Sequence, residues 1–326
     1  MLYVINDNVN PYFNLALEEY LLKEFDEECF MLWRNSPCIV VGKNQNTLGE
    51  INLDYVRKHD IKVVRRLSGG GAVFHDLGNL NFTFIVNDLD NCFCDFRKFT
   101  APIIAVLAKL GMGAELSGRN DLCISGLKFS GNAQYKYKDR LLHHGTILFS
   151  AAIADITAAL QVNPSKFEGK GIKSVASRIT NIQSHLSAPL TIEELETQIS
   201  EQVKMDRENY ELYRLTSMDI ERVDQFVKGK YATWDWNYGT SPEYNLQNKA
   251  RFKGGSVEVL LNVKNGIIQN VRVFGDFFGK YDVYQIEQAF IGVKHEEKAI
   301  RDTLSQFRFE DYLAGVTDSE FLALLF

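Results

Sequence analysis

The sequence has little of what two large classes of protein require. Its 42 acidic residues outnumber its 36 basic ones, which gives a formal net charge of −6, whereas general nucleic-acid binders are normally basic. No apolar run approaches the roughly 20 residues that span a bilayer, and the opening MLYVINDNVN contains no signal-peptide pattern. We therefore expect a cytoplasmic protein with no membrane segment and no nucleic-acid partner.

Cysteine and the common phosphate loops are scarce or missing as well. The odd set of five cysteines contains no CxxC pair and consists of Cys29, Cys38, Cys92, Cys94 and Cys123. This pattern gives no zinc spacing and argues against a disulfide framework. Neither GxxxxGK[ST] nor GxGxxG between a strand and a helix occurs. Any anionic substrate must therefore be bound by local clusters of Arg and Lys.

A chain of 326 residues exceeds the usual size of a single-core domain, so we expect one large and one smaller domain. Hydrophobic periodicity predicts helices over 11–25, 53–59, 100–110, 153–160 and 192–204, and strands over 30–33, 38–42, 61–65, 80–86, 128–133 and 144–149. In the first helix we expect leucines mostly on one side and acids opposite. The turn 76–79 predicts a hairpin that joins a strand ending at His75 to the following strand, where apolar residues alternate with Asn81 and Thr83.

The C-terminal part changes character from about Asn248. Two alternating segments, 257–263 and 267–274, flank Asn265-Gly266, and Asn-Gly in this position is the strongest local hairpin signal. Helices are predicted over 297–307 and 319–325. We expect a large domain over 1–245 and a small α+β domain over 246–326. Because hairpins and helices do not follow a strict β-α-β order, the fold class predicted is α+β with a mixed or mostly antiparallel sheet.

Glycine and arginine are concentrated in the segment 65–71. Arg65 and Arg66 precede Ser68 and three consecutive glycines. Such glycines let the backbone approach a ligand closely and aim N–H groups at anionic oxygens, and the arginines can pair with carboxylate or phosphate. The alternative is a loose turn beside a solvated basic pair. The segment alone does not decide between the two.

A second polar segment, 118–122, contains Asn120 and Asp121. These side chains can hydrogen-bond a nucleobase or hold Mg²⁺ through a carboxylate oxygen, and a turn built on Asn-Asp chemistry is the alternative. Arg140 lies 19 residues after Asp121 and shortly before two adjacent histidines. His143 and His144 face opposite sides of a strand and cannot readily share a metal, so we expect one core residue and one polar lining residue.

Lys128 begins the segment KFSGNAQ and alternates with the apolar Phe129. It can therefore point from a strand into a cleft. A lysine in that position would hold a carboxylate beside a phosphate and neutralise the charge that develops as the carboxylate attacks phosphorus. The alternative is an exposed lysine on an edge strand.

Taken together, these segments resemble one known family. RRLSGGGAVFHDLGN (65–79), SGRNDL (117–122), KFSGNAQ (128–134), HHGTILF (143–149), KSVASRITN (173–181) and WDWNYGTSP (234–242) resemble segments of bacterial lipoate–protein ligases. LWRNSPCIVVGKNQN (32–46) resembles the segment that precedes the glycine loop in that family. The resemblance covers nearly the whole chain. It implies a catalytic domain with the fold of class II aminoacyl-tRNA synthetases and biotin ligases, plus an accessory C-terminal domain.

The resemblance also implies a reaction. Lipoate and ATP, with Mg²⁺, would give lipoyl-adenylate and pyrophosphate, and the lipoyl group would then pass to the ε-amine of a lysine. The expected carriers are the glycine-cleavage H protein and the E2 subunits of 2-oxoacid dehydrogenases. The enzyme is expected to be a monomer. Because an apolar tunnel discriminates poorly between similar chains, octanoate should be tolerated.

Residue by residue, the resemblance assigns Lys128 as the essential lysine, in contact with both the lipoyl carbonyl and the phosphate. It places ATP and adenylate binding at Arg66, Gly71, Ala72, Val73, Phe74, Asn120, Asp121 and Lys128, with Asp121 also expected to bind Mg²⁺. It places lipoyl binding at Trp33, Ser68, Gly69, Gly70, His75, Arg140 and Lys128. Trp33 would form an apolar wall at the dithiolane end. The loop 173–181 would cover the adenylate, and Ala176 stands where an arginine is frequent in the family, which leaves Arg178 for any charge contact.

Three alternatives remain open. An octanoyl- or lipoyl-transferase of the same fold would work without ATP and often through a cysteine thiolate, for which Cys123 lies nearest in sequence but is predicted to be a buried strand thiol. A biotin ligase would need a basic glycine-arginine loop that this chain lacks. A non-catalytic lipoate-binding protein is the third. Neither the preferred carrier nor the completion of both half-reactions follows from the sequence.

Overall fold

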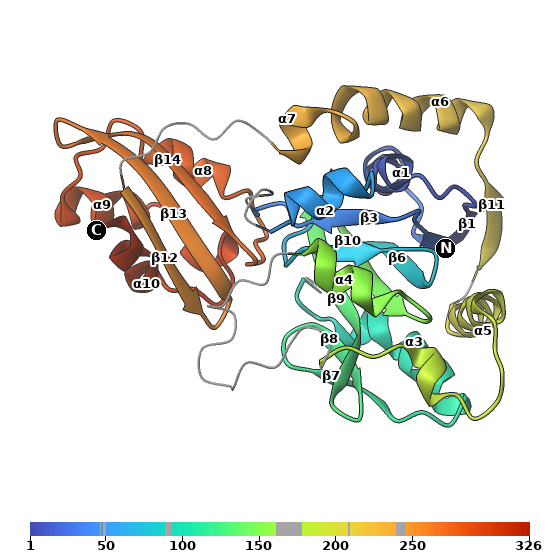
Figure 1. The fold of residues 1–326 in the computed structure, drawn as a ribbon. Coiled ribbons are helices and arrows are strands. Elements are labelled where there is room, and N and C mark those ends of the chain that lie inside the picture. The colour runs from blue at the N-terminus through green and yellow to red at the C-terminus, as the bar shows by residue number, and fades with distance from the viewer. Residues whose placement is uncertain (46, 48–49, 89–92, 161–177, 208, 239–245) are drawn as a thin grey trace.

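The computed structural model describes residues 1–45, 47, 50–88, 93–160, 178–207, 209–238 and 246–326. Figure 1 shows two units, of which the C-terminal one, coloured orange to red, lies on the left. The larger unit is built on an eight-stranded sheet and a three-stranded sheet, and the C-terminal unit on another three-stranded sheet. The loop 173–181 predicted to cover the adenylate lies outside the described residues up to position 177.

The eight-stranded sheet is mixed. In spatial order its strands are β11 (Glu211–Arg214), β1 (Leu2–Ile5), β2 (Cys29–Arg34), β6 (Asn79–Asn87), β10 (Arg140–Leu148), β9 (Leu127–Tyr137), β8 (Asp121–Ile124) and β7 (Ala114–Ser117). β1 runs parallel to both of its neighbours, and the other pairs are antiparallel. The predicted α+β class with a mixed sheet is confirmed.

The two faces of this sheet have different coverings, as the alternation along β6 requires. Leu80, Phe82 and Phe84 pack in a core with α3 (Arg97–Lys109) and α5 (Ile192–Met205). The opposite face meets α1 (Pro11–Glu24) and α6 (Ser217–Phe226). It also meets the small sheet of β4 (Lys62–Arg65), β3 (Cys38–Val41) and β5 (Val73–His75). Asn79, Asn81 and Thr83 therefore point toward this second face, where Thr83 meets Glu18 of α1.

The C-terminal unit has its own apolar core. Its antiparallel strands are β12 (Leu246–Phe252), β13 (Gly255–Lys264) and β14 (Ile267–Gly275), covered by α8 (Tyr284–Ala289), α9 (Glu297–Leu304) and α10 (Asp318–Leu322). Asn265 and Gly266 have φ of 53° and 72° and form the tight turn between β13 and β14, so the hairpin predicted there is confirmed. The proposed domain boundary after residue 245 lies next to a segment that the structure leaves undescribed, and it stays a prediction.

The remaining elements are short. They are α2 (Leu53–Lys58), α4 (Ile153–Ala159), the 3-10 turn η4 (Ile182–His185), the π-helical turn η5 (Val227–Tyr231), α7 (Trp234–Asn237) and the 3-10 turns η6 (Phe309–Asp311) and η7 (Ala323–Leu325).

Three local predictions were wrong. The segments that end at His75 and begin at Asn79 do not form a hairpin, because β5 pairs with β3 in the small sheet while β6 pairs with β2 and β10. The helix expected from Thr100 begins at Arg97, which places Pro102 inside it rather than in its first turn. The acids Glu18 and Glu19 of α1 do not face solvent, since both are at most 2% exposed.

The two units meet beside the glycine segment. The Gly275 N–H donates to the Asn44 carbonyl at 2.6 Å, and the Arg119 guanidinium lies 4.5 Å from the centroid of the Phe278 ring. A side chain at Gly69 would collide with the Phe277 carbonyl.

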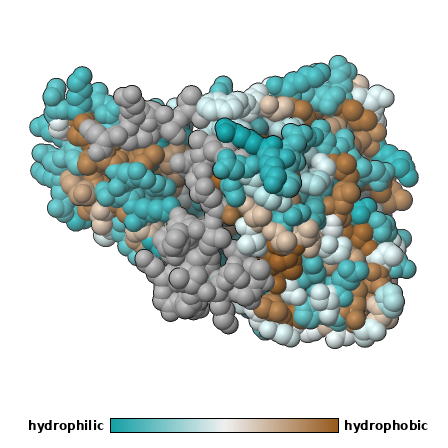
Figure 2. Space-filling model, in the orientation of Figure 1, coloured by the Kyte–Doolittle hydropathy of each residue, from teal (hydrophilic) through white to brown (hydrophobic). Residues whose placement is uncertain are grey.

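Hydrophobic and hydrophilic residues are interspersed on the face shown in Figure 2. No helix in the described part of the chain is both long and apolar enough to cross a membrane.

Candidate active site

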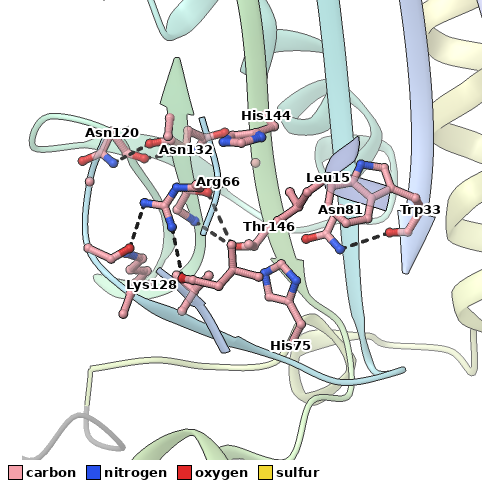
Figure 3. Close-up of a pocket in the computed structure, with 18 residues that line it drawn as sticks. Leu15, Trp33, Arg66, His75, Asn81, Asn120, Lys128, Asn132, His144 and Thr146 are labelled. Atoms are coloured by element: carbon pink, nitrogen blue, oxygen red, sulfur yellow. Dashed lines mark hydrogen bonds between the residues drawn. The ribbon is translucent and has the colours of Figure 1, made fainter. Parts of the chain in front are cut away.

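A pocket with about 620 Å³ of empty space, part of it open to solvent, lies between the eight-stranded sheet and the small sheet. It is lined by Leu15, Trp33, Val40, Arg66, Gly70, Gly71, Ala72, Val73, His75, Asn81, Asn120, Lys128, Gly131, Asn132, Ala133, His144, Gly145 and Thr146. Figure 3 shows Lys128 and Trp33 on opposite sides of this space. Half of the lining residues come from four adjacent strands of the eight-stranded sheet, β9, β10, β6 and β2, and the others from α1, the small sheet, the segment 66–72 and Asn120. With strands about 4.8 Å apart, the pocket crosses roughly 14 Å of sheet from Lys128 to Trp33.

Lys128 is aimed into the pocket by an irregularity in β9. The pairing register with β8 shifts between Leu122 and Cys123, which leaves Phe129 as an extra residue on β9. Such a bulge re-aims neighbouring side chains. Phe129 is buried in the core, whereas the Lys128 side chain is 37% exposed at the pocket mouth. The expectation that this lysine points from a strand into a cleft is confirmed.

The surroundings of Lys128 hold its backbone more tightly than its side chain. The Lys128 N–H donates to the Arg178 carbonyl and the Lys128 carbonyl accepts from the Thr180 N–H, both at 2.8 Å. The ammonium pairs with Asp121 at 2.8 Å, and both side chains are 37% exposed. A Cβ at Gly131 would lie 3.0 Å from the Lys128 Nζ, so glycine there leaves the side chain room to move.

The glycine segment is shaped by Arg66. Gly70 has φ of 90°, a conformation that glycine adopts at no steric cost. The Arg66 guanidinium donates to the carbonyls of Gly69 and Gly71 at 2.7 and 2.8 Å, and its Nε donates to Ser68 Oγ at 3.0 Å. The carbonyls of Gly69 and Gly71 therefore face Arg66, and Gly70 and Gly71 line the pocket.

The two arginines of this segment differ in role. Burial lowers the pKa of Arg66 to about 10, while the nearby Glu18 charge opposes the shift, so Arg66 stays protonated at neutral pH. Arg65 points away from the pocket and donates to the carbonyls of Gly42, Gln45 and Trp236. The expectation that both arginines could meet a ligand anion is therefore corrected for Arg65, which instead fixes the turn after β3.

A buried chain of hydrogen bonds runs under the pocket from Trp33 to Arg66. The indole N–H donates to Thr83 Oγ1 at 2.8 Å, and that hydroxyl donates to Glu18 at 2.6 Å. The Glu18 carboxylate also accepts from His144 Nδ1 at 3.0 Å. His144 Nε2 lies 2.6 Å from Ser68 Oγ, which accepts from Arg66. Each of the side chains in this chain thereby has a hydrogen-bond partner, as buried polar atoms require.

The histidine pair divides as expected. His143 is fully buried and stacks on Phe99 with ring centroids 4.7 Å apart. Its Nε2 lies 3.3 Å from Asn132 Oδ1, and the Asn132 amide donates to the Asn120 carbonyl at 3.1 Å. His144 lines the pocket. The prediction of one core residue and one lining residue is confirmed.

The structure brings together most of the predicted site residues but not all. Arg66, Gly70, Gly71, Ala72, Val73, Trp33, His75, Asn120 and Lys128 line the pocket. Ser68 reaches it through His144, and Asp121 through its ion pair with Lys128. Arg140 is not part of the pocket, since it sits at the start of β10 and donates to the Glu27 carbonyl at 2.6 Å. The Phe74 side chain packs away from the pocket, against Ile39 and Val41.

Asn81, which lines the pocket, and Thr83 and Glu18, which belong to the hydrogen-bond chain under it, were missed as site residues. Asn81 and Thr83 are the polar positions of the alternating strand β6, and that alternation was the signal for them. Glu18 carried no such signal, because an acid in an amphipathic helix normally faces solvent. Ala176 and the rest of 173–177 lie outside the described residues.

The cysteines that the structure describes do not line the pocket. Burial raises the pKa of the Cys123 thiol, as does the nearby Asp121 charge, which disfavours a reactive thiolate. Among the described residues, no group of three or more His, Cys, Asp or Glu side chains is placed to hold a metal ion.

Comparison with known proteins gives a consistent result over the whole chain. Residues 10–204 match the family model of the lipoyl protein ligase A/B catalytic domain, and residues 241–325 match that of the bacterial lipoate protein ligase C-terminus. Lipoate-protein ligase LplJ of Bacillus subtilis is 46% identical over 331 residues, with 100% of each chain covered.

Two solved structures are also similar. LipL1 of P. falciparum in complex with lipoate has a TM-score of 0.81 at 25% identity, covering 99% of this chain and 97% of that one. A lipoate-protein ligase A bound with ATP has a TM-score of 0.61 at 25% identity, covering 73% of this chain and 98% of that one.

Proposed function

Because the chain belongs to the lipoate–protein ligase family, we propose that it joins free lipoate to carrier lysines by way of a lipoyl-adenylate. In the first half-reaction lipoate and ATP give lipoyl-AMP and pyrophosphate. In the second, the ε-amine of a carrier lysine takes the lipoyl group and AMP leaves. The observation that carries this proposal is the placement of Lys128 and Trp33 at opposite ends of one pocket.

The ends of the pocket suit the two ends of lipoate. Trp33, Leu15 and Val40 give the inner end an apolar surface, which fits a dithiolane ring and hydrocarbon chain. Lys128 and the amides of Asn120 and Asn132 give the mouth cationic and polar groups. The lipoate carboxylate would therefore lie at Lys128, beside the glycine segment.

Lys128 acts on the first half-reaction through charge. A carboxylate oxygen attacks the α-phosphorus of ATP, and the bond from that phosphorus to the bridging oxygen breaks, so that pyrophosphate leaves. Two anions must approach each other before this happens. The Lys128 ammonium would lie between them and stabilise the charge as it builds on the phosphoryl oxygens, an effect worth roughly 3 kcal/mol or more for one such group.

The second half-reaction depends on position and on exclusion of water. Only about one lysine amine in a thousand is unprotonated at neutral pH, so the carrier lysine must be held in attack geometry, which can contribute roughly 7–11 kcal/mol. The amine attacks the acyl carbon, the acyl–phosphate bond breaks, and the amine loses a proton. The site must also exclude water from the mixed anhydride, which would otherwise hydrolyse.

We expect Mg²⁺ to bind at the mouth of the pocket through a carboxylate. Asp121 supplies a carboxylate beside Lys128, and Mg²⁺ in nucleotide sites takes one or two carboxylates together with phosphate oxygens. Asp121 would thus hold the ion jointly with ATP, and the ion would neutralise phosphate charge. For the ion to bind, Asp121 would exchange its partner Lys128.

The carriers we propose are the glycine-cleavage H protein and dehydrogenase E2 lipoyl domains. A cytoplasmic location and a monomeric state also stay predictions. The ATP-independent transferase is the second candidate, but the described cysteines lie outside the pocket and Cys123 is a buried strand thiol with a raised pKa.

The test offers purified apo-carriers with two acyl sources. With lipoate and ATP, we expect lipoylated carrier and AMP in equal amounts. With an octanoylated carrier as donor and no ATP, we expect no transfer. Transfer in the second mixture but not the first would overturn the proposal and establish the transferase. Running H protein and E2 domain separately would show which carrier is preferred.

A further inference from the structure

His75 contains a polar atom in the pocket that has no partner in the described part of the chain. The residue is 3% exposed, and its Nε2 is buried without a hydrogen bond. It lies at the inner end, where its ring centroid is 6.3 Å from that of Trp33. An unpaired buried donor or acceptor costs about 1–3 kcal/mol. A group of this kind in a pocket is suited to meet a ligand atom.

The network behind His75 fixes which of its nitrogens carries the proton. Asn14 Nδ2 donates to the carbonyls of Asn8 and Arg34 and to Asn35 Oδ1, at 2.8 to 3.0 Å. Since these partners all accept, the Asn35 oxygen must face Asn14 and the Asn35 Nδ2 must face His75. That Nδ2 lies 3.1 Å from His75 Nδ1 and donates to it. His75 Nδ1 is thus the acceptor, and the proton is on Nε2.

His75 is also neutral. Burial lowers its pKa to about 3, and the charges of Arg66 and His144 add to the effect. At neutral pH the pocket therefore presents a single, uncharged Nε2–H donor at its inner end. Because the imidazole is neutral, it brings no positive charge to attract an anion. Its Nε2–H is therefore suited to a neutral acceptor.

The position of this donor limits what the acceptor can be. If the ligand carboxylate lies at Lys128, across four strands, the inner end receives the far end of the acid. An unbranched fatty acid has only hydrocarbon there, whereas the dithiolane ring of lipoate brings two sulfur atoms, which are weak acceptors. We propose that His75 Nε2–H donates a hydrogen bond to a dithiolane sulfur and so selects lipoate over fatty acids of similar length.

This inference rests on the proposed function, which supplies the ligand and its orientation. It refines the expected tolerance of octanoate. Apolar contact alone discriminates weakly between similar chains, but a buried polar group that is left unpaired adds a penalty to the wrong ligand. Octanoate should bind, yet it should leave Nε2–H without a partner.

The test compares lipoate with its cyclopentyl analogue, in which carbon replaces both sulfurs, and with octanoate. The readout is kcat/KM for acid-dependent ATP–pyrophosphate exchange, together with the Kd of each acid by calorimetry. Wild type should prefer lipoate over the analogue by about fivefold, the effect of one modest hydrogen bond. Equal kcat/KM and equal Kd for the two acids in wild type would overturn the inference without any variant.

Two His75 variants locate the effect. In His75→Phe, lipoate should lose affinity while the analogue and octanoate gain it, because no unpaired donor remains. In His75→Gln, an amide N–H at the same place should keep part of the preference. A merely structural defect would lower all three acids together, and that outcome in both variants would count against the inference.

Val40→Ala is the matched control. Val40 lines the same end of the pocket but has no polar side-chain atom, so the ratio of lipoate to analogue should stay at its wild-type value. Failure of the His75 inference can be distinguished from failure of the proposed function. Binding of lipoate without any exchange would overturn the adenylation step and leave the Kd comparison to decide on His75. Binding of none of the acids would overturn both.

Discussion

The inner end and the mouth of the pocket differ in how deeply their polar side chains are buried and in how those side chains are paired. At the inner end, Glu18, Thr83 and Trp33 are at most 3% exposed and are joined by hydrogen bonds of 2.6 to 2.8 Å. At the mouth, Lys128 and Asp121 form one ion pair with both side chains 37% exposed. The inner end is organised before any ligand arrives, whereas the side chains of the mouth are free to exchange partners.

The difference follows from what each end has to do. The inner end binds the same part of the acid throughout, and a satisfied buried network keeps one arrangement of its walls. The mouth must accept ATP, release pyrophosphate and then admit a carrier lysine. A half-exposed ion pair costs little to break. Lys128 can therefore leave Asp121 for the reacting anions at low cost.

The largest expected effect is on the inner end. Glu18→Ala should lower the free energy of unfolding by about 4 kcal/mol, because it removes the carboxylate that accepts from Thr83 and His144 and leaves the buried Arg66 without the negative charge that favours its protonated form. Urea unfolding measures the change.

The control lies on the same helix. Glu24 pairs with Arg222 at 3.3 Å, and both side chains are at least 40% exposed, so Glu24→Ala should cost less than about 1 kcal/mol. Equal losses in the two variants would mean that the buried chain does not stabilise the inner end.

The next effect is on the acids accepted. Trp33→Ala should cost about 3 kcal/mol of stability, since a large buried ring is removed. It should also enlarge the inner end, so that bulkier carboxylic acids support ATP–pyrophosphate exchange. An acid profile unchanged from wild type would show that Trp33 is not the end wall.

The smallest effect is expected at the mouth. Asp121→Asn should change the free energy of unfolding by less than about 1 kcal/mol, because its ion pair is half-exposed. If Asp121 holds Mg²⁺ with the phosphates, the Mg²⁺ concentration for half-maximal exchange should rise severalfold. An unchanged Mg²⁺ requirement would remove Asp121 as a ligand.

The residues at the mouth of the pocket were easier to predict from the sequence than those at the inner end. Lys128, Asn120 and the glycine segment were found because their residue types can bind anions and nucleotides and because they occur together in the motifs that resemble the family. The bulge at Phe129 that aims Lys128 is a matter of pairing between β8 and β9, which local pattern does not reveal.

The inner end depends on contacts between distant segments. Glu18 meets Thr83 and His144, which are 65 and 126 residues away along the chain. The same limit explains the hairpin error at His75, because turn chemistry at 76–79 does not say that β5 joins a different sheet from β6. Contacts of Phe277 and Phe278 with Gly69 and Gly70 also escape local pattern.

The most direct test of the central claim is lipoate-dependent ATP–pyrophosphate exchange in wild type and Lys128→Ala, with urea unfolding of both. We predict exchange that requires lipoate in wild type, a fall of roughly 100-fold or more in the variant, and unfolding free energies within about 1 kcal/mol of each other. Exchange that survives in Lys128→Ala, or wild-type exchange that does not require lipoate, would contradict the account.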